Sequence, residues 1–257
     1  MSGKVYFIGA GPGDPDLLTR KAWKILASAE IVLHDALVAP EILRLAPAGA
    51  MVSDVGKRCG QKSITQEELH ALMVRHAADG HTVVRLQGGD PLIFGRAGEE
   101  IAALREAGID FEIVPGVTAA SAAAAAAQIS LTHRKLASQV IFLSAHRRSG
   151  EDAPDWEGLP VTDATLVIYM PGGKYEEIAQ RLRAAGYAED AACLIVSRAS
   201  TPGQAIVQTD LASLPQVREA AVPAPALLII GEVTRTEAHE LAAAWPRAAR
   251  SKKGFAI

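Results

Sequence analysis

Residues 83–100 read VVRLQGGDPLIFGRAGEE and contain a complete strand–loop–helix unit. The apolar run is typical of a buried strand, the pair Gly88-Gly89 ends it, and a helix is predicted from about Gly98 to Ala107. Loops at the carboxyl ends of parallel strands carry the sites of α/β proteins, and paired glycines let backbone approach a ligand closely. The segment therefore predicts a ligand site in the loop around Asp90.

The same order recurs on both sides of this unit. Strands are predicted at 5–8, 31–33, 51–55, 82–86 and 111–114, and helices at 17–27, 40–45, 66–79 and 98–107. This alternation predicts an α/β fold with a mostly parallel sheet that is covered on both faces.

The second half changes character after Pro115. An alanine-rich helix is predicted at 118–128, strands at 140–143, 165–169, 193–197, 205–209 and 227–230, further helices at 175–185 and 237–244, and a polar loop at 147–162. We therefore expect two α/β domains, an N-terminal one of residues 1–115 and a C-terminal one of residues 116–257.

The composition is that of an ordinary globular protein, with 257 residues, 49% hydrophobic and 21% charged. A net charge of −3 supplies no basic field for nucleic acid. No apolar run approaches the ~18 residues that span a membrane, and the start turns into a glycine loop too soon for a signal peptide. Neither the distant Cys59 and Cys193 nor the histidines show metal-ligand spacing. We expect a cytoplasmic protein with no metal site, no nucleic acid partner and no membrane contact.

The first glycine loop, Gly9 to Asp14, follows a strand and precedes a helix, as a dinucleotide-binding loop does. The dinucleotide fingerprint has its third glycine five residues after the first, where this chain has Asp14. Asp14 or Asp16 can cap the helix, with Pro15 in its first turn, so an anion would meet a carboxylate. Three interpretations stay open: a dinucleotide site, a structural tight turn, or a loop that binds a neutral or cationic ligand.

Two later loops have a structural and a functional interpretation each. Asp90 either caps a turn or faces a cationic or hydroxylated ligand. Thr118 is a good N-cap for the alanine-rich helix. The alanine run 122–127 leaves a smooth helix surface, suited to close packing or to the wall of a pocket.

Several basic residues lie in the predicted loops: some follow strands or lie in a glycine-rich loop, and two follow the alanine-rich helix. They are Lys57, Arg58, Arg96, His133 and Arg134. A cleft that gathers them would bind a polycarboxylate through charge-assisted hydrogen bonds. The alternative is a set of separate, solvated charges.

The loops taken together resemble those of the tetrapyrrole methylase family. In chain order they are Gly9 to Pro15, Asp35 to Val38, Val55 to Arg58, Gln66 to Glu68, Val84 to Glu100, Val114 to Ala119 and Leu131 to Arg134. The match covers residues 4 to about 235. Gly89-Asp90-Pro91 with Phe94-Gly95-Arg96, together with Leu131 to Arg134, points to the branch that methylates uroporphyrinogen III.

The resemblance implies two α/β domains of the class III methyltransferase type, an active-site trough between them, and a homodimer. It implies S-adenosylmethionine as methyl donor and S-adenosylhomocysteine as product. The implied reaction is methylation of uroporphyrinogen III at macrocycle positions two and seven, which gives precorrin-2 through precorrin-1. That product serves sirohaem and cobalamin biosynthesis, a branch of porphyrin biosynthesis. We expect no fused dehydrogenase–ferrochelatase module, because the chain starts at the first methylase strand.

The resemblance also assigns site residues. It places the donor against Pro12, Gly88, Gly89, Asp90, Ile93, Thr118, Ala119, Met170, Ala199 and Ala226. Asp35 is implied as proton acceptor and Lys57 as proton donor. For the carboxylates of the substrate, we expect contacts with Arg58, Arg96, His133 and Arg134.

The sequence departs from the family pattern at several positions. Ala36 stands where arginine is common, Gln87 where lysine is usual, and Ala97 and Ala199 where glycine is usual. Pro171-Gly172-Gly173 replaces a loop that commonly has a single glycine.

Three alternatives to the leading function stay open. The first alternative is a methylase of a later precorrin. The second is a nicotinamide-dependent oxidoreductase, and the third is a tetrapyrrole carrier without catalytic activity. Turnover on the two tetrapyrroles, a dinucleotide titration, and donor binding separate these alternatives from the leading function.

Overall fold

The structure is a computed structural model, and it describes residues 3–56, 64–145, 156 and 158–235. The predicted helix at 237–244 and most of the predicted loop at 147–162 lie outside these residues. So do Lys57 and Arg58. No helix in the described part of the chain is long and apolar enough to cross a membrane.

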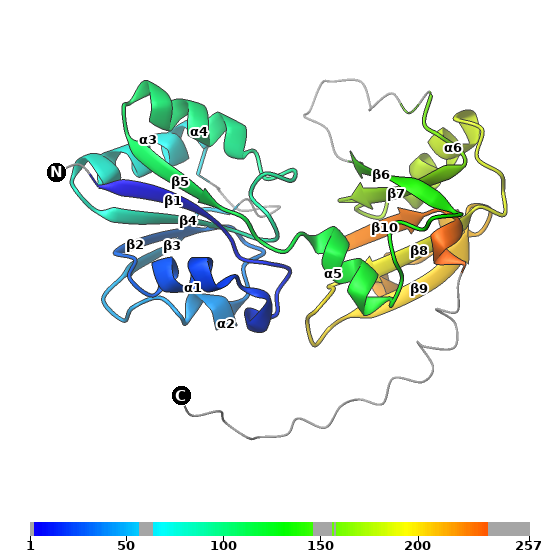
Figure 1. Ribbon diagram of the computed structural model, residues 1–257, viewed down its shortest axis with the longest axis horizontal. Helices are drawn as coiled ribbons and strands as arrows, with labels where there is room; N and C mark the ends of the chain where they lie inside the picture. Colours follow the sequence, from blue (N-terminus) through cyan, green and yellow to red (C-terminus); the bar gives the residue numbers. More distant parts are fainter. Residues whose placement is uncertain (1–2, 57–63, 146–155, 157, 236–257) are drawn as a thin grey trace, which may run out of the picture.

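The first half is built on a parallel sheet of five described strands (Figure 1). The strands are β1 (Lys4–Gly9), β2 (Ile31–His34), β3 (Met51–Asp54), β4 (Thr82–Gln87) and β5 (Asp110–Val114), in the order β3-β2-β4-β1-β5. Every pairing between them is parallel. The predicted parallel sheet is therefore confirmed for this half.

Helices cover both faces of this sheet, as predicted (Figure 1). One face carries α1 (Arg20–Leu26) and α2 (Pro40–Leu43), and the other carries α3 (Gln66–Ala78) and α4 (Ala97–Glu106). Side chains alternate along β4: Val83 joins the α3/α4 core and Val84 the α1/α2 core. Two covered faces explain why the strands read as continuous apolar runs.

Two helix starts follow from local capping. Thr65 and Glu68 form a capping box at the start of α3, and Thr65 is one of the two residues, with Ser63, that the sequence offers as caps for this helix. The helix predicted at 17–27 starts later: Pro15–Leu17 is a separate 3-10 turn capped by Asp14, and Thr19 caps α1. Asp14 and Pro15 thus act as helix-start residues for the short turn.

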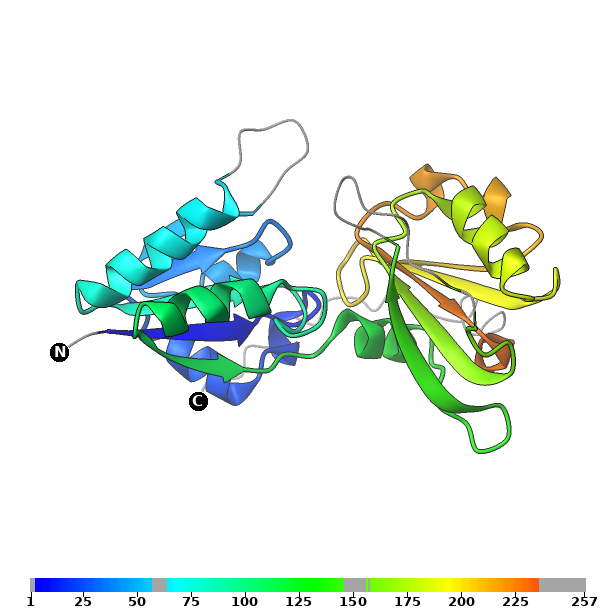
Figure 2. The ribbon, with the colours of Figure 1, turned by 90° about the horizontal axis from the view of Figure 1, so that it is seen from above.

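The second half is built on a sheet of different topology. Its described strands are β6 (Ala137–Ser144), β7 (Asp163–Tyr169), β8 (Ala192–Ser197), β9 (Ala205–Asp210) and β10 (Ala226–Ile230), in the order β6-β7-β10-β8-β9. Only β6 and β7 pair in parallel among them, because β10 inserts antiparallel between β7 and β8. Figure 2 shows the two sheets in separate lobes that lie side by side along the long axis of the molecule.

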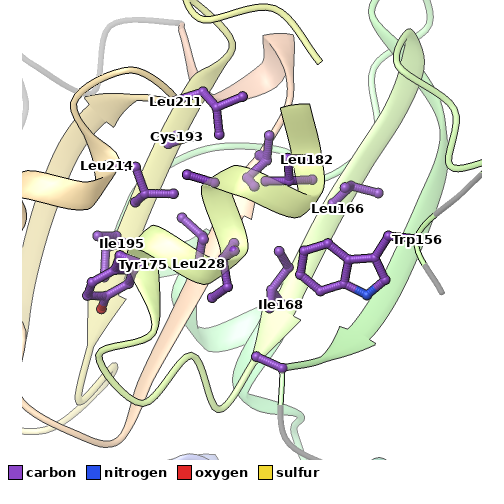
Figure 3. Close-up of a cluster of buried hydrophobic side chains, with 14 of the residues drawn as sticks. Trp156, Leu166, Ile168, Tyr175, Leu182, Cys193, Ile195, Leu211, Leu214 and Leu228 are labelled. Carbon is purple, nitrogen blue, oxygen red and sulfur yellow. The ribbon is translucent and has the colours of Figure 1, made fainter. Parts of the chain in front are cut away.

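Helix α5 (Ala119–Ala126) covers one face of the second sheet and α6 (Tyr175–Ala184) the other. The remaining described elements are 3-10 turns at Leu214–Gln216, Glu219–Ala221 and Glu232–Thr234. The α6 core packs Trp156, Leu182 and Cys193 together (Figure 3). Burial raises the pKa of the Cys193 thiol to about 12, so this cysteine is a packing residue rather than a nucleophile.

A buried ion pair lies beneath the loop that follows β4. Arg85 lies inside β4, and the sequence did not predict the surroundings of its side chain. The side chain points into the α3/α4 layer, where its Nε donates to Glu100 Oε2 at 3.0 Å. The side chains are 7% and 1% exposed, and Arg85 Nη1 also donates to the carbonyl oxygens of Leu33 and Leu86. The pair ties β4 to β2 and α4 directly under the site.

Arg85→Met leaves the Glu100 carboxylate buried without its cation, and we expect the free energy of unfolding to fall by about 3–5 kcal/mol. The double variant Arg85→Met/Glu100→Leu removes both charges and should regain most of that loss. Urea unfolding measures both. Arg44→Met, which breaks the exposed Arg44–Glu41 pair, is the control, with an expected cost below about 1 kcal/mol. Equal losses for the single and double variants would contradict the pairing.

Candidate active site

A central cavity lies at the carboxyl ends of β1, β2 and β4, where they face the second sheet. The structure brings to its lining every residue that the resemblance assigned to the donor. They are Pro12, Gly88, Gly89, Asp90, Ile93, Thr118, Ala119, Met170, Ala199 and Ala226. Asp35 lines it too. Their grouping is a finding of the structure, whereas their contact with a donor stays a prediction.

The first glycine loop and the loop after β4 are joined by their backbones. Gly11 N donates to Gly89 O at 3.1 Å, and Gly89 N donates to Gly11 O at 2.7 Å. This reciprocal pair extends the β1–β4 pairing past the ends of the strands. The two glycine-rich loops therefore form one edge of the cavity.

Asp35 joins the loop after β2 to the same segment. Its Oδ2 accepts from Gly88 N at 2.9 Å, and its Oδ1 accepts from Leu37 N at 2.9 Å. Each oxygen accepts one backbone N–H, and a carboxylate oxygen has a second lone pair available. Asp35 therefore holds two loops together and can still accept a hydrogen bond or a proton from a ligand.

Asp90 joins the loop after β5 in the same way. Its Oδ1 accepts from Leu92 N at 2.8 Å, and its Oδ2 accepts from Gly116 N at 3.0 Å. The turn-capping interpretation of Asp90 is therefore confirmed, and the carboxylate also lines the cavity.

Gly116 shows how closely these loops approach one another. A Cβ atom at this position would clash with Gly89 O and with the backbone of Gly9. Only glycine lets the loops after β1, β4 and β5 meet at one point.

Thr118 has a different role from the one predicted. Its side chain makes no capping hydrogen bond to α5, and its Oγ1 instead lies 2.6 Å from the Tyr169 hydroxyl. Thr118 thus occupies the predicted N-cap position of α5, but its side chain does not cap the helix, because a partner from the second sheet takes the hydroxyl. Burial raises the pKa of Tyr169, so its phenol stays protonated at neutral pH and forms this bond.

The alanine run packs rather than lining the cavity. Ala122, Ala123 and Ala127 are buried against Val167 and Leu194 of the second sheet. Of the two interpretations of this run, close packing is what the structure has, and the wall of the cavity starts one turn earlier at Ala119.

A smaller, polar cavity adjoins the central one. Asp35, Gln87 and Phe94 line both, and Arg96 lines the polar cavity. Arg96 Nε and Nη2 donate to the Glu99 carboxylate at 3.0 and 2.6 Å. Arg96 therefore reaches this cavity as half of an ion pair.

His133 and Arg134 lie at the other end of the second sheet. His133 bridges to Ala137, which pairs with Asp163, whereas Tyr169 at the far end of β7 lines the central cavity. The run from Asp163 to Tyr169 spans about 20 Å at roughly 3.3 Å per residue. We expected one cleft to gather all five basic residues. Within one copy of the chain, this expectation is wrong for His133 and Arg134, because they lie too far from the central cavity.

Sequence reasoning missed several residues of the cavity. Phe94, Tyr169 and Arg198 line it without having been assigned a role. Phe94 packs against Tyr169 with ring centroids 5.0 Å apart, which links the two halves. The available signal was position: Phe94 lies in the loop after β4, and Tyr169 directly precedes Met170 at the end of a strand.

The first glycine loop lacks the geometry of a dinucleotide site. The Asp14 carboxylate accepts from Asp16 N at 2.9 Å, and the three-residue turn at Pro15–Leu17 separates the loop from α1. A pyrophosphate site needs the free N–H groups of a helix start directly after the glycines. The loop is a tight turn at the edge of the cavity.

The chain is similar to proteins of one family over most of its length. The family model for tetrapyrrole (corrin/porphyrin) methylases matches residues 4–215. Siroheme synthase 2 of Aeromonas hydrophila is 46% identical over 231 residues, which cover 90% of this chain and 49% of that protein. The chain thus spans about half the length of this curated relative.

Two further relatives extend the comparison. The chloroplastic S-adenosyl-L-methionine-dependent uroporphyrinogen III methyltransferase of Arabidopsis thaliana is 43% identical over 247 residues, 95% of this chain and 66% of that protein. The crystal structure of uroporphyrin-III C-methyl transferase from Thermus thermophilus complexed with S-adenyl homocysteine superposes with a TM-score of 0.79, at 42% identity, covering 91% of this chain and 100% of that one. The two α/β halves with a cavity between them, and the sequence over residues 4–215, place this chain in the tetrapyrrole methylase family.

Proposed function

We propose that this chain transfers methyl groups from S-adenosylmethionine to uroporphyrinogen III at positions two and seven, giving precorrin-2 through precorrin-1. The product serves sirohaem or cobalamin biosynthesis. The observation that carries the proposal is the central cavity, which gathers all the residues expected at the donor from both halves of the chain. The named activity of the Arabidopsis relative supports the choice of substrate.

The residues of the cavity fit a sulfonium donor, which supplies an electrophilic methyl group when bound. Ile93, Ala119 and Ala226 offer apolar surface, and the carboxylates of Asp35 and Asp90 suit a cation better than a phosphate. The N–H groups of Gly88, Gly89 and Gly116 already donate to Asp35, Gly11 and Asp90, so they are not free to bind a phosphate. The protein's task at this end is to orient the donor and exclude water.

Asp35 is our candidate for proton acceptor. It lines both cavities, so it lies where a macrocycle that rests across the rim would meet a donor held in the central cavity. Methylation of a ring carbon leaves a proton to be removed, and a positioned carboxylate can accept it. Lys57, the proposed proton donor, follows Gly56, which lines the polar cavity.

The rim suits a flat, carboxylate-bearing ring system. Leu37, Phe94 and Met170 are 64%, 43% and 46% exposed and line the central cavity. Arg96 stands at the polar side with Arg58 as its proposed companion. Apolar faces for the ring and basic groups for its carboxylates support substrate binding across this rim.

We propose a homodimer in which His133 and Arg134 reach the substrate of the second copy. Their distance from the central cavity within one chain supports this, because their predicted substrate role then requires a partner. We also place the domain boundary at residues 115–116, supported by the end of the first sheet at Val114 and the start of α5 at Ala119. A cytoplasmic location stays the expectation from composition.

Asp35→Asn should lower kcat by about 10²-fold or more, since it removes the proposed base. The amide keeps one of the two acceptor oxygens that hold Gly88 and Leu37, so binding of S-adenosylhomocysteine checks that the donor cavity survives, and it should stay within about threefold. Asp54→Asn is the matched control: Asp54 ends β3 and accepts from Gly56 N at 2.9 Å, as Asp35 does for Leu37. Radiolabelled methyl transfer to uroporphyrinogen III measures turnover, with precorrin-2 as competing substrate. Wild-type protein that leaves uroporphyrinogen III unmethylated, or prefers precorrin-2, rules out the proposal.

Mixing two inactive variants tests the shared site. When the Asp35→Asn chain and the Arg134→Ala chain are refolded together, about half of the twofold dimers contain one chain of each kind. Each such heterodimer has one intact site out of two, so about a quarter of wild-type activity should return. Each variant alone should stay impaired. If the mixture is no more active than its components, Arg134 does not act across the dimer.

A further inference from the structure

The turn Phe94-Gly95-Arg96 holds an unusual backbone shape at the junction of the two cavities. Phe94 and Arg96 have φ angles of 54° and 57°, in the left-handed region that non-glycine residues avoid. A Cβ at Gly95 would lie 2.5 Å from Pro91 O, so the turn is also tightly packed. Such backbone persists only where surrounding contacts hold it.

Gln87 supplies the contact that holds this turn. It is the last residue of β4 and is only 3% exposed, and its Nε2 donates to Gly95 O at 2.7 Å. A carbonyl oxygen accepts only from a donor, which fixes the orientation of the amide. Its Oε1 is buried and accepts from no described residue.

The backbone of this turn determines where the Phe94 ring lies. The ring lies 5.0 Å from that of Tyr169 and lines both cavities. Its position therefore decides the shape of the wall between them. The chain of contacts runs from Gln87 through Gly95 to Phe94 and Tyr169.

We propose that Gln87 is a positioning residue for methyl transfer: its amide N–H clamps Gly95 O and thereby keeps the Phe94 ring between the two cavities. This inference rests on the proposed function for its kinetic part. The Nε2–H group of Gln87 makes the clamping hydrogen bond, and its Oε1 atom does not contribute to it. Gln87 acts through Phe94: it lines both cavities itself, but the residue is only 3% exposed.

Three variants separate the two ends of the amide. Gln87→Met keeps the length and loses both ends, and Gln87→Lys keeps a donor and has no acceptor. Methionine at this position should lower kcat about tenfold, with the S-adenosylhomocysteine dissociation constant within about threefold, because a shifted wall disturbs alignment more than donor binding. Lysine should restore kcat to within about threefold of wild type. If Gln87→Met does not fold, Gln87→Leu, which also lacks a donor, takes its place.

A double variant tests whether the effect passes through the ring. In a Phe94→Leu background, Gln87→Met should cause no further loss of kcat, since coupled residues are non-additive. Independent losses would overturn the proposal. So would an unchanged kcat in Gln87→Met, or a Gln87→Lys enzyme as slow as the methionine variant.

A spectroscopic measurement tests the clamp without any substrate. The chain has five phenylalanines, so 4-fluorophenylalanine labelling gives a small ¹⁹F spectrum in which Phe94→Leu identifies the Phe94 signal. That signal should move in Gln87→Met and stay in place in Gln87→Lys. An unmoved signal overturns the clamp, whereas inactivity of the wild type on uroporphyrinogen III overturns only the proposed function.

Discussion

The structure depends on how the backbone N–H groups at the ends of β1, β2, β4 and β5 find acceptors. Four loops converge on Gly88 to Asp90, and buried or half-buried N–H groups need partners. Two carboxylates and one reciprocal backbone pair satisfy them: Asp35 accepts from Gly88, Asp90 from Gly116, and Gly11 pairs with Gly89. The same groups that hold the loops together therefore form the edge of the cavity.

This solution also sets the charge of the site. Loops held by carboxylates present negative groups to a ligand, whereas a phosphate-binding loop presents free N–H groups. The first half thus supplies polar, tightly constrained loops, and the second supplies apolar wall and aromatic contacts. The Phe94–Tyr169 contact joins the two halves across the cavity, and the Thr118–Tyr169 hydrogen bond fixes the start of α5 to the second sheet. The proposed methyl transfer needs reactants held in alignment, and these contacts fix the walls that would align them.

Local patterns predicted most of the fold because the first sheet is built from adjacent strand–loop–helix units. β4, α3 and α4 were expected almost at their observed bounds, since their apolar periodicity and caps are local signals. The start of α1 was placed too early, because Asp14 and Thr19 are both good caps and the pattern does not choose between them. The strand order and the antiparallel β10 are long-range pairings that no local pattern encodes.

The sequence by itself located the loops of the site, because glycines and carboxylates directly after strands mark a sheet edge wherever the sheet is placed. The family, and the residues predicted at the donor, came from the resemblance of those loops to the family pattern. Only the tertiary structure decided the partners of those residues. Arg85 found Glu100, Thr118 found Tyr169, and Phe94 became the wall between two cavities. His133 and Arg134 were placed at the far end of the second sheet by the register of β6 against β7. The physical reason is that these contacts join residues far apart in the sequence. They form when the chain packs, so local sequence patterns do not predict them.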